Sequence, residues 1–133
     1  MRRSNQGFTL IEIMIVIAII GLVLTLSLPA ITEYTKKPHR TEIAGLLSDQ
    51  AQLLERFYSK SGVYTGAADL SSGNDDYSIT ATLADKTFLL TATPKAESKM
   101  AGDKCGSFSI SETGATTISN QAEGVTAKDC WGR

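Results

Sequence analysis

The 133-residue sequence is poor in the residues on which most enzyme and metal sites depend. It contains one histidine, His39, and two cysteines, which do not form a CxxC motif. No second histidine accompanies His39, and no metal-ligand spacing is present. A nucleophile elbow and a paired-carboxylate motif are also missing. We therefore expect no catalysis, no metal site and no cofactor.

An excess of positive charge is missing as well. The sequence has 13 basic and 14 acidic residues, which gives a formal net charge of −1. Such a balance gives no support to broad, charge-driven binding of nucleic acid. A small basic edge is still conceivable, although scattered solubilising lysines are the interpretation we favour. Its members would be Lys95, Lys99, Lys104, Lys128 and Arg133.

Charged residues are almost absent from one long segment. Phe8 to Leu28 is apolar except for Glu12. As a helix these residues would extend about 31 Å, enough to cross a hydrocarbon core of about 30 Å. Arg2 and Arg3 precede the segment, and this places the N-terminus in the cytoplasm. A charge at this depth costs roughly 2.5–3.5 kcal/mol, so Glu12 should have a function.

The residues at the start of this segment, GFTLIE at positions 7–12, follow a short basic leader. This arrangement resembles the processing site of type IV pilins. The resemblance implies that a prepilin peptidase cuts between Gly7 and Phe8 and that the new amine of Phe8 is methylated. Gly7 would let the peptidase approach the backbone closely, because glycine has no side chain.

An ordinary secretory signal peptide fits less well. A signal peptidase needs small residues at −3 and −1, whereas cleavage after Ala30 would put Leu28 at −3. In the resembled family, Glu12 is proposed to pair with the amine of Phe8 in a neighbouring subunit. Two charges about 4 Å apart attract strongly in an apolar core, so the pair would set the register of assembly. A tolerated polar residue near the membrane interface is the alternative for Glu12.

A second, amphipathic part follows the apolar segment. Apolar residues recur at spacings of three and four from Ile31 to Tyr58, which predicts one helix from Phe8 to about Lys60. Pro29 and Pro38 should kink it, and Gly21 should weaken it. Gly21 and Pro29 are therefore candidates for local flexibility, with a static kink as the alternative. Polar residues on the other faces include Glu33, Lys36, Arg40, Asp49, Gln52 and Glu55.

Alternating apolar residues follow in the C-terminal half. They predict an antiparallel hairpin from residues 77–83 and 88–93, a third strand at 105–111 and a short fourth at 114–118. We expect residues 62–76 and 119–133 to be loops. Asn74, Asp75 and Asp76 could bind calcium, although a solvated loop is the better interpretation.

The fold class is therefore α+β, with a long N-terminal helix packed on a three- or four-stranded antiparallel sheet, as in the pilin fold. We expect a cleaved leader at residues 1–7, a membrane-spanning helix at 8–28 and an extracytoplasmic head at 29–133. Cysteines outside the cytoplasm most often pair. The run CGSFSI at 105–110, with Gly114 and DCW at 129–131, also resembles the disulfide region of type IVa pilins, closest to PilE-type minor pilins and DNA-uptake pilins. Both arguments indicate a disulfide between Cys105 and Cys130.

These patterns predict a structural subunit of a type IV pilus, acting in assembly, adhesion or twitching motility. We favour a minor pilin that primes or joins the fibre. A major pilin, a DNA-uptake receptor pilin and a type II secretion pseudopilin are the alternatives. Partners would be other pilin subunits, the prepilin peptidase and the inner-membrane assembly platform, and we expect no sequence-specific DNA binding. The chain would lie in the inner membrane before assembly and in an extracellular pilus afterwards.

Overall fold

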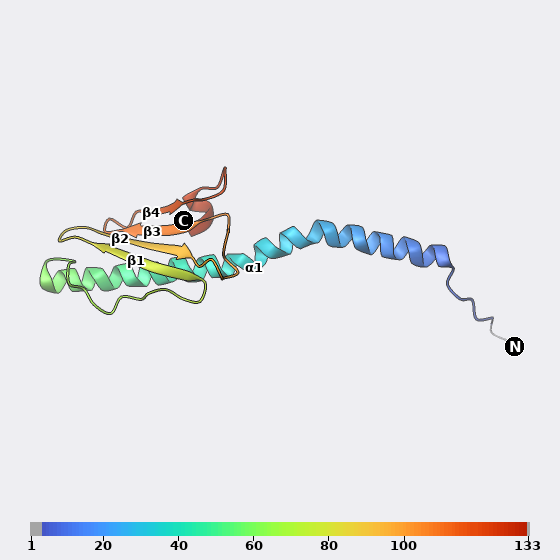
Figure 1. Ribbon diagram of the computed structural model, residues 1–133, viewed down its shortest axis with the longest axis horizontal. Coiled ribbons are helices and arrows are strands. Elements are labelled where there is room, and N and C mark those ends of the chain that lie inside the picture. The colour runs from blue at the N-terminus through green and yellow to red at the C-terminus, as the bar shows by residue number, and fades with distance from the viewer. Residues whose placement is uncertain (1–3, 133) are drawn as a thin grey trace. The chain divides into compact units, whose positions relative to one another are not determined.

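The computed structural model describes residues 4–132. Helix α1 spans Leu10–Ser61, and a short helix, α2, spans Ala127–Trp131 (Figure 1). Four strands lie between them: β1 Tyr77–Leu83, β2 Phe88–Pro94, β3 Ser107–Ser111 and β4 Thr116–Ser119. The chain divides into two compact units, one ending at Thr35 and the other beginning at Lys36. From here on we call the described residues of the first unit, 4–35, the apolar segment, which includes the apolar run Phe8–Leu28, and we call the second unit the head.

Helix α1 confirms the single long helix expected from the sequence, and it continues through both Pro29 and Pro38. It is the one helix in the described part of the chain that is long and apolar enough to cross a membrane, with a mean hydropathy of 2.7 in its most apolar window. The helix ends at Gly62, which adopts a φ of +76° and donates its amide to the carbonyl of Tyr58. A left-handed glycine of this kind commonly terminates helices.

The four strands form one antiparallel sheet in the order β1-β2-β3-β4. The hairpin, the third strand and the short fourth strand expected from the alternation are thus confirmed. Side chains on one face of the sheet, among them Tyr77, Leu90 and Phe108, are fully buried. Within the head, α1 lies along this sheet (Figure 1) and supplies Ile43, Leu47 and Leu54 to the same core. The sheet therefore has the amphipathic part of α1 as its cover.

The buried face of α1 begins later than the apolar spacing predicted. Ile31 and Tyr34 are 55% and 80% exposed, whereas Ile43 is fully buried. The prediction that Arg40 lies on a polar face of the helix was also wrong. Arg40 is 7% exposed because its guanidinium pairs with the carboxylate of Asp103, 63 residues along the chain. Hydropathy cannot distinguish such a buried, paired cation from a solvated one.

The C-terminal region contains more structure than the loop expected from its composition. Thr126 and Asp129 form a capping box, in which each side chain accepts a hydrogen bond from the backbone amide of the other, and this starts α2. The predicted disulfide between Cys105 and Cys130 is confirmed, with a Cα–Cα distance of 5.9 Å. Gly106 follows with a φ of +63°, and a Cβ there would lie 2.2 Å from the carbonyl oxygen of Ser119. Only glycine fits where the two segments come so close.

Candidate functional site

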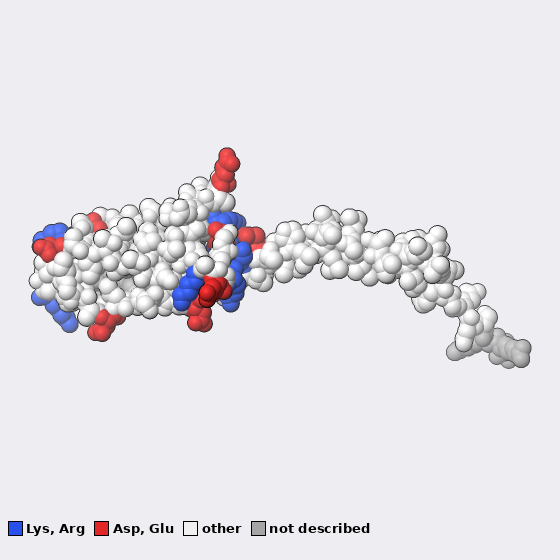
Figure 2. Space-filling model, in the orientation of Figure 1, with Lys and Arg blue, Asp and Glu red and all other residues white. Residues whose placement is uncertain are grey.

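The apolar segment carries a continuous exposed apolar surface. Its large apolar side chains are between 49% exposed, at Ile13, and 86% exposed, at Phe8. In the space-filling view this segment is almost free of the blue and red that mark charged side chains (Figure 2). An exposed apolar surface of this extent marks a site that contacts a membrane or other proteins. The head has no comparable surface among its described residues, where the exposed large apolar side chain is Leu89.

Glu12 and Thr9 form a capping box at the start of α1. The Glu12 carboxylate accepts hydrogen bonds from the backbone amide of Thr9 at 2.8 Å and from its hydroxyl at 3.1 Å, and the Thr9 hydroxyl accepts one from the Glu12 amide at 3.3 Å. The spacing T-x-x-E signals this motif in the sequence, but the sequence analysis missed it. Thr9 thus aims the Glu12 carboxylate. Glu12 also lines a groove of about 530 Å³ with Phe8, Ile13, Ile15 and Val16.

The residues predicted to be processed are accessible. Phe8 is 86% exposed, and no atom outside the neighbouring residues lies within 4 Å of a Cβ built on Gly7. A peptidase could therefore reach the bond between them, although cleavage and methylation stay predictions. The surroundings of Gly21 are equally open, and Pro29 lies inside α1 without ending it. Local flexibility at these two positions also stays a prediction.

A buried ion pair ties α1 to the connection between β2 and β3. Arg40 Nε donates to Asp103 Oδ2 at 2.8 Å, Arg40 Nη2 donates to Oδ1, and Asp103 is 4% exposed. Burial raises the pKa of Asp103, but the hydrogen bonds and the charge of Arg40 outweigh it and hold this pKa below its ordinary value. The pair therefore stabilises the carboxylate form of Asp103 and holds this part of the connection against α1.

The lysines of the proposed basic edge lie at two places. Lys95, Lys99 and Lys104 are in the connection between β2 and β3, which we call the lysine loop (residues 95–106), and Lys128 is in α2. Hydrogen bonds from Thr126, followed by the charges of Lys104 and Lys128, lower the pKa of Asp129, so these two lysines lie near a carboxylate. At the end of the head where α1 enters it, Figure 2 shows blue side chains intermixed with red ones. Arg133, the fifth predicted member, lies outside the described residues.

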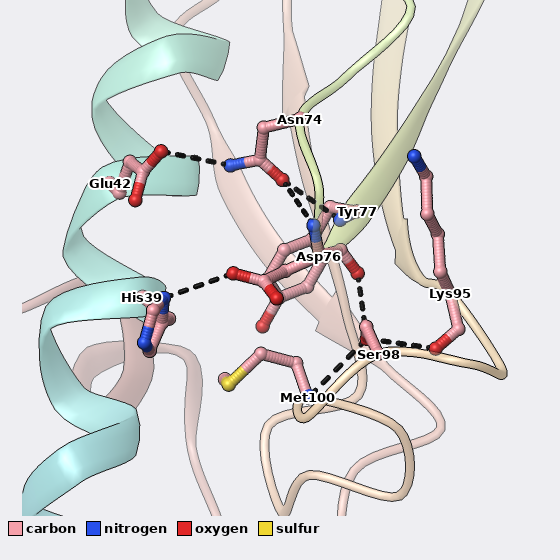
Figure 3. Close-up of polar contacts among 8 residues, drawn as sticks. All are labelled: His39, Glu42, Asn74, Asp76, Tyr77, Lys95, Ser98 and Met100. Carbon is pink, nitrogen blue, oxygen red and sulfur yellow. Dashed lines mark hydrogen bonds and ion pairs between the residues drawn. The ribbon is translucent and has the colours of Figure 1, made fainter.

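The candidate calcium residues have structural partners instead. The Asn74 side-chain oxygen accepts the amides of Asp76 and Tyr77 at 3.0 and 2.9 Å, and Asn74 also donates to Glu42 (Figure 3). Asp76 Oδ2 lies 2.9 Å from His39 Nδ1. Across residues 4–132, no group of three or more histidine, cysteine or acidic side chains is arranged to hold a metal ion. The solvated-loop interpretation thus needs amendment, because Asp76 is buried and packed against α1.

Comparisons with protein-family models place two matches on this chain. Residues 2–28 match the prokaryotic N-terminal methylation motif. Residues 29–109, more than half of the chain, match the family described as "Type IV minor pilin ComP, DNA uptake sequence receptor". Together these matches cover both the apolar segment and most of the head.

Curated relatives and solved structures agree with these matches. The chain is 34% identical over 101 residues to fimbrial protein EcpC of Eikenella corrodens, covering 71% of this chain and 66% of EcpC. It is 38% identical over 64 residues to the type IV major pilin protein PilE of Neisseria gonorrhoeae, covering 48% of this chain and 38% of PilE. The chain thus spans less than two thirds of the length of either relative.

Two solved structures share the fold. A type IV pilin from Shewanella oneidensis matches with a TM-score of 0.55 and 28% identity, covering 65% of this chain and 94% of that one. The non-core minor pilin PilV of Neisseria meningitidis matches with a TM-score of 0.58 and 22% identity, covering 67% of this chain and 93% of PilV. The second likeness concerns the fold alone.

Proposed function

We propose that this chain, which belongs to the ComP family of type IV minor pilins, is incorporated into a type IV pilus as a minor structural subunit. The observation that supports this most strongly is the apolar segment, whose large apolar side chains are exposed throughout its described residues. Before assembly the bilayer would bury these side chains, and in the fibre the equivalent segments of other pilin subunits would do so. In this proposal, assembly moves the apolar side chains from the bilayer into contact with other subunits, so they stay out of water throughout.

Processing and register would depend on the first residues of the mature chain. In our proposal the prepilin peptidase cuts after Gly7 and the amine of Phe8 is methylated. Glu12 would then pair with this amine in a neighbouring subunit. Thr9 already directs the carboxylate through the capping box. In an apolar surrounding an unpaired carboxylate is costly, so subunits would align where the two charges meet.

Mass spectrometry of sheared fibres tests this proposal. We expect the chain in the fibres, beginning at methylated Phe8 and much less abundant than the main subunit. Gly7→Val should leave an uncut precursor in the inner membrane. Gly45→Val is the matched control, because the surroundings of Gly45 are also open and it lies in the head part of α1. A mature chain that begins elsewhere, or that is absent from fibres, would contradict the proposal.

Reception of DNA is a second candidate function, and the description of the matching family favours it. Its structural support is limited to the three lysines of the lysine loop and Lys128 of α2. The acidic neighbour of Lys104 and Lys128 weakens their combined field. The near-neutral charge balance of the chain also argues against tight non-specific binding. We therefore keep the expectation that this chain does not bind DNA sequence-specifically, and the following experiment tests it.

A titration of the full chain, in detergent micelles, with duplex DNA decides whether the chain is also a DNA receptor. If the lysine loop and α2 contact about four phosphates, the logarithm of the binding constant should fall with log salt with a slope of roughly −3.6. Replacing Lys99 and Lys104 by glutamine should reduce that slope. Arg56→Gln with Lys60→Gln is the control, since it removes two cations elsewhere in the head. Binding that survives unlabelled competitor and disappears only in the first variant would establish a receptor.

A further inference from the structure

A groove on the head lies between α1 and the segment that leads from α1 to β1, which runs back alongside the helix (Figure 1). We call it the head groove, and its volume is about 410 Å³. One side is lined by Leu53, Arg56, Phe57 and Lys60 of α1, and the other by residues of the stretch 66–69. Leu53 and Phe57 are half-buried, whereas Arg56 and Lys60 are exposed. The head groove therefore has an apolar floor and a positively charged rim.

The head groove is held in shape by hydrogen bonds on both sides of the stretch 66–69. Before this stretch, the Tyr64 hydroxyl donates to Glu55 Oε1 at 2.8 Å. After it, the Ser71 amide donates to Gln50 Oε1 at 2.8 Å. Both acceptors belong to α1, so the stretch is fixed to the helix at each end. A preformed groove of this kind binds a partner without first having to order its own walls.

The beginning of the amphipathic part of α1 carries two apolar side chains that the head does not bury. Ile31 and Tyr34 belong to the apolar spacing of the helix, yet they are 55% and 80% exposed. Their separation of three residues puts both on one face of α1. They are continuous with the exposed surface of the apolar segment, and tyrosine is enriched where proteins meet. These two residues are therefore candidates for a contact with another subunit.

The spacing of this pair matches the floor of the head groove. Leu53 and Phe57 are four residues apart on one face of α1, as Ile31 and Tyr34 are three apart on theirs. Consider two parallel α1 helices shifted so that Tyr34 of one is level with Phe57 of the other. Ile31 then comes to within one residue of the level of Leu53. A single shift thus brings both apolar pairs together.

The same shift brings opposite charges together at the rim. Glu33 of one helix comes level with Arg56 of the other. Lys37 comes level with Lys60, and there Asp69, which lines the other side of the head groove, supplies a negative charge. Exposed pairs of this kind add little affinity, but they disfavour wrong registers because like charges would then meet. Shape and charge therefore favour the same alignment.

We propose that the head groove is the docking site for α1 of the next pilin subunit in the fibre. That helix inserts an exposed apolar residue and an aromatic residue at the positions of Ile31 and Tyr34. The inference rests on the proposed function, because the contact belongs to a fibre. Groove and inserted residues are different surfaces of one chain, so the contact is head-to-tail. Such a contact continues from subunit to subunit as a helical filament instead of closing into a dimer.

The position of the two surfaces along α1 also sets when the contact can form. A helix rises about 1.5 Å per residue, so Tyr34 and Phe57 lie roughly 34 Å apart along α1. Two chains anchored at the same depth in a bilayer hold these residues at different heights and cannot make the contact. A subunit that has left the membrane by this distance can make it with one that follows. The docking is therefore specific to the fibre.

Photo-cross-linking of the full chain tests the docking. p-Benzoylphenylalanine replaces Phe57, whose ring it resembles, and inner membranes and sheared fibres are irradiated separately. We expect the fibres to contain an adduct that peptide mass spectrometry places on α1 of a neighbouring subunit, at the residues aligned with 31–34. The membrane fraction should lack it. The same photo-reactive residue at Thr80, exposed on β1, is the control and should not label that stretch.

The outcomes separate this inference from the proposed function. A chain that is present in fibres but gives no adduct on that stretch, or gives the same adduct in membranes, overturns the docking alone. A chain that is absent from fibres overturns both the docking and the proposed function.

Charge reversal at the rim gives a second, independent measurement. Arg56→Glu combined with Lys60→Glu should lower the amount of the chain in fibres several-fold. It should leave the unfolding of the head unchanged, because both side chains are exposed. Lys95→Glu with Lys99→Glu changes the net charge equally elsewhere on the head and should be incorporated as wild type. Tyr34→Ala should lower incorporation as the rim variant does. Wild-type incorporation of the rim variant would refute the docking.

Discussion

The two parts of helix α1 have the same backbone geometry but opposite surroundings. In the head, Leu47 and Leu54 are fully buried, whereas Leu22 and Leu24 of the apolar segment are 63% and 53% exposed. Burying a leucine side chain stabilises a protein by roughly 1.5–3 kcal/mol. Leu47 and Leu54 therefore contribute to the stability of the head, whereas Leu22 and Leu24, which are exposed, make no such contribution. Helix formation therefore does not decide burial. The head part packs on a sheet encoded further along the chain. The side chains of the apolar segment are exposed, and the cover that we propose for them is a membrane or other pilin subunits.

The largest expected effect comes from breaking the buried ion pair of the head. Asp103→Ala leaves the Arg40 guanidinium buried without its partner and should reduce the free energy of unfolding of the head by roughly 3–5 kcal/mol. Denaturant titration followed by the fluorescence of Trp131, the one tryptophan of the sequence, measures this. Asp49→Ala, at an exposed position of α1, is the control and should change little. A small effect of Asp103→Ala would mean that solvent reaches the pair.

Loss of the disulfide should have the next largest effect. Replacing Cys105 and Cys130 by serine frees a loop of 25 residues. By the chain-entropy model this costs about 3–4 kcal/mol. Residues 119–132 should become the first site of proteolysis, while the apolar segment in a micelle stays protected as before. If the cleavage pattern is unchanged in a protease time course, contacts of Trp131 rather than the disulfide hold this region.

A leucine pair tests the comparison within α1 directly. Leu54→Ala creates a cavity in the core and should destabilise the head by about 2–5 kcal/mol. Leu24→Ala, the same change in the apolar segment, should leave the unfolding of the head unaltered and reduce incorporation into fibres instead. Parallel denaturation and fibre-content measurements separate the two outcomes. Equal destabilisation by both variants would show that the two units fold as one.

The smallest expected effect is a change in how steeply the free energy of unfolding falls with decreasing pH. Because the pKa of Asp103 is lower in the folded head than its ordinary value, its stabilisation is present above about pH 4 and is lost as the pH falls through the lowered value. Wild type should therefore lose stability with decreasing pH more steeply than Asp103→Asn. Unfolding free energies measured at a series of acidic pH values give both slopes. Identical slopes would assign the acid response to other carboxylates.

Much of the fold could be predicted because its signals are local. The strands at Tyr77–Leu83 and Phe88–Pro94 follow an alternation of apolar residues that any reader of the sequence can see. The short helix α2 was missed although its capping box, Thr126 to Asp129, is also a local signal. The same oversight hid the capping box of Thr9 and Glu12. Hydropathy carries neither signal, because a capping box is a pattern of polar side chains at the start of a helix.

The sequence by itself determined the apolar segment, its orientation signal, the motif at Gly7 and Phe8 and the alternation of the strands, because each depends on residues that are neighbours in the chain. Only the tertiary structure decided that Arg40 meets Asp103 and that His39 meets Asp76. These partners lie far apart in sequence and come together only when α1 packs on the sheet. A polar residue looks the same in a sequence whether it will face solvent or a buried partner, since its energy depends on what surrounds it after folding.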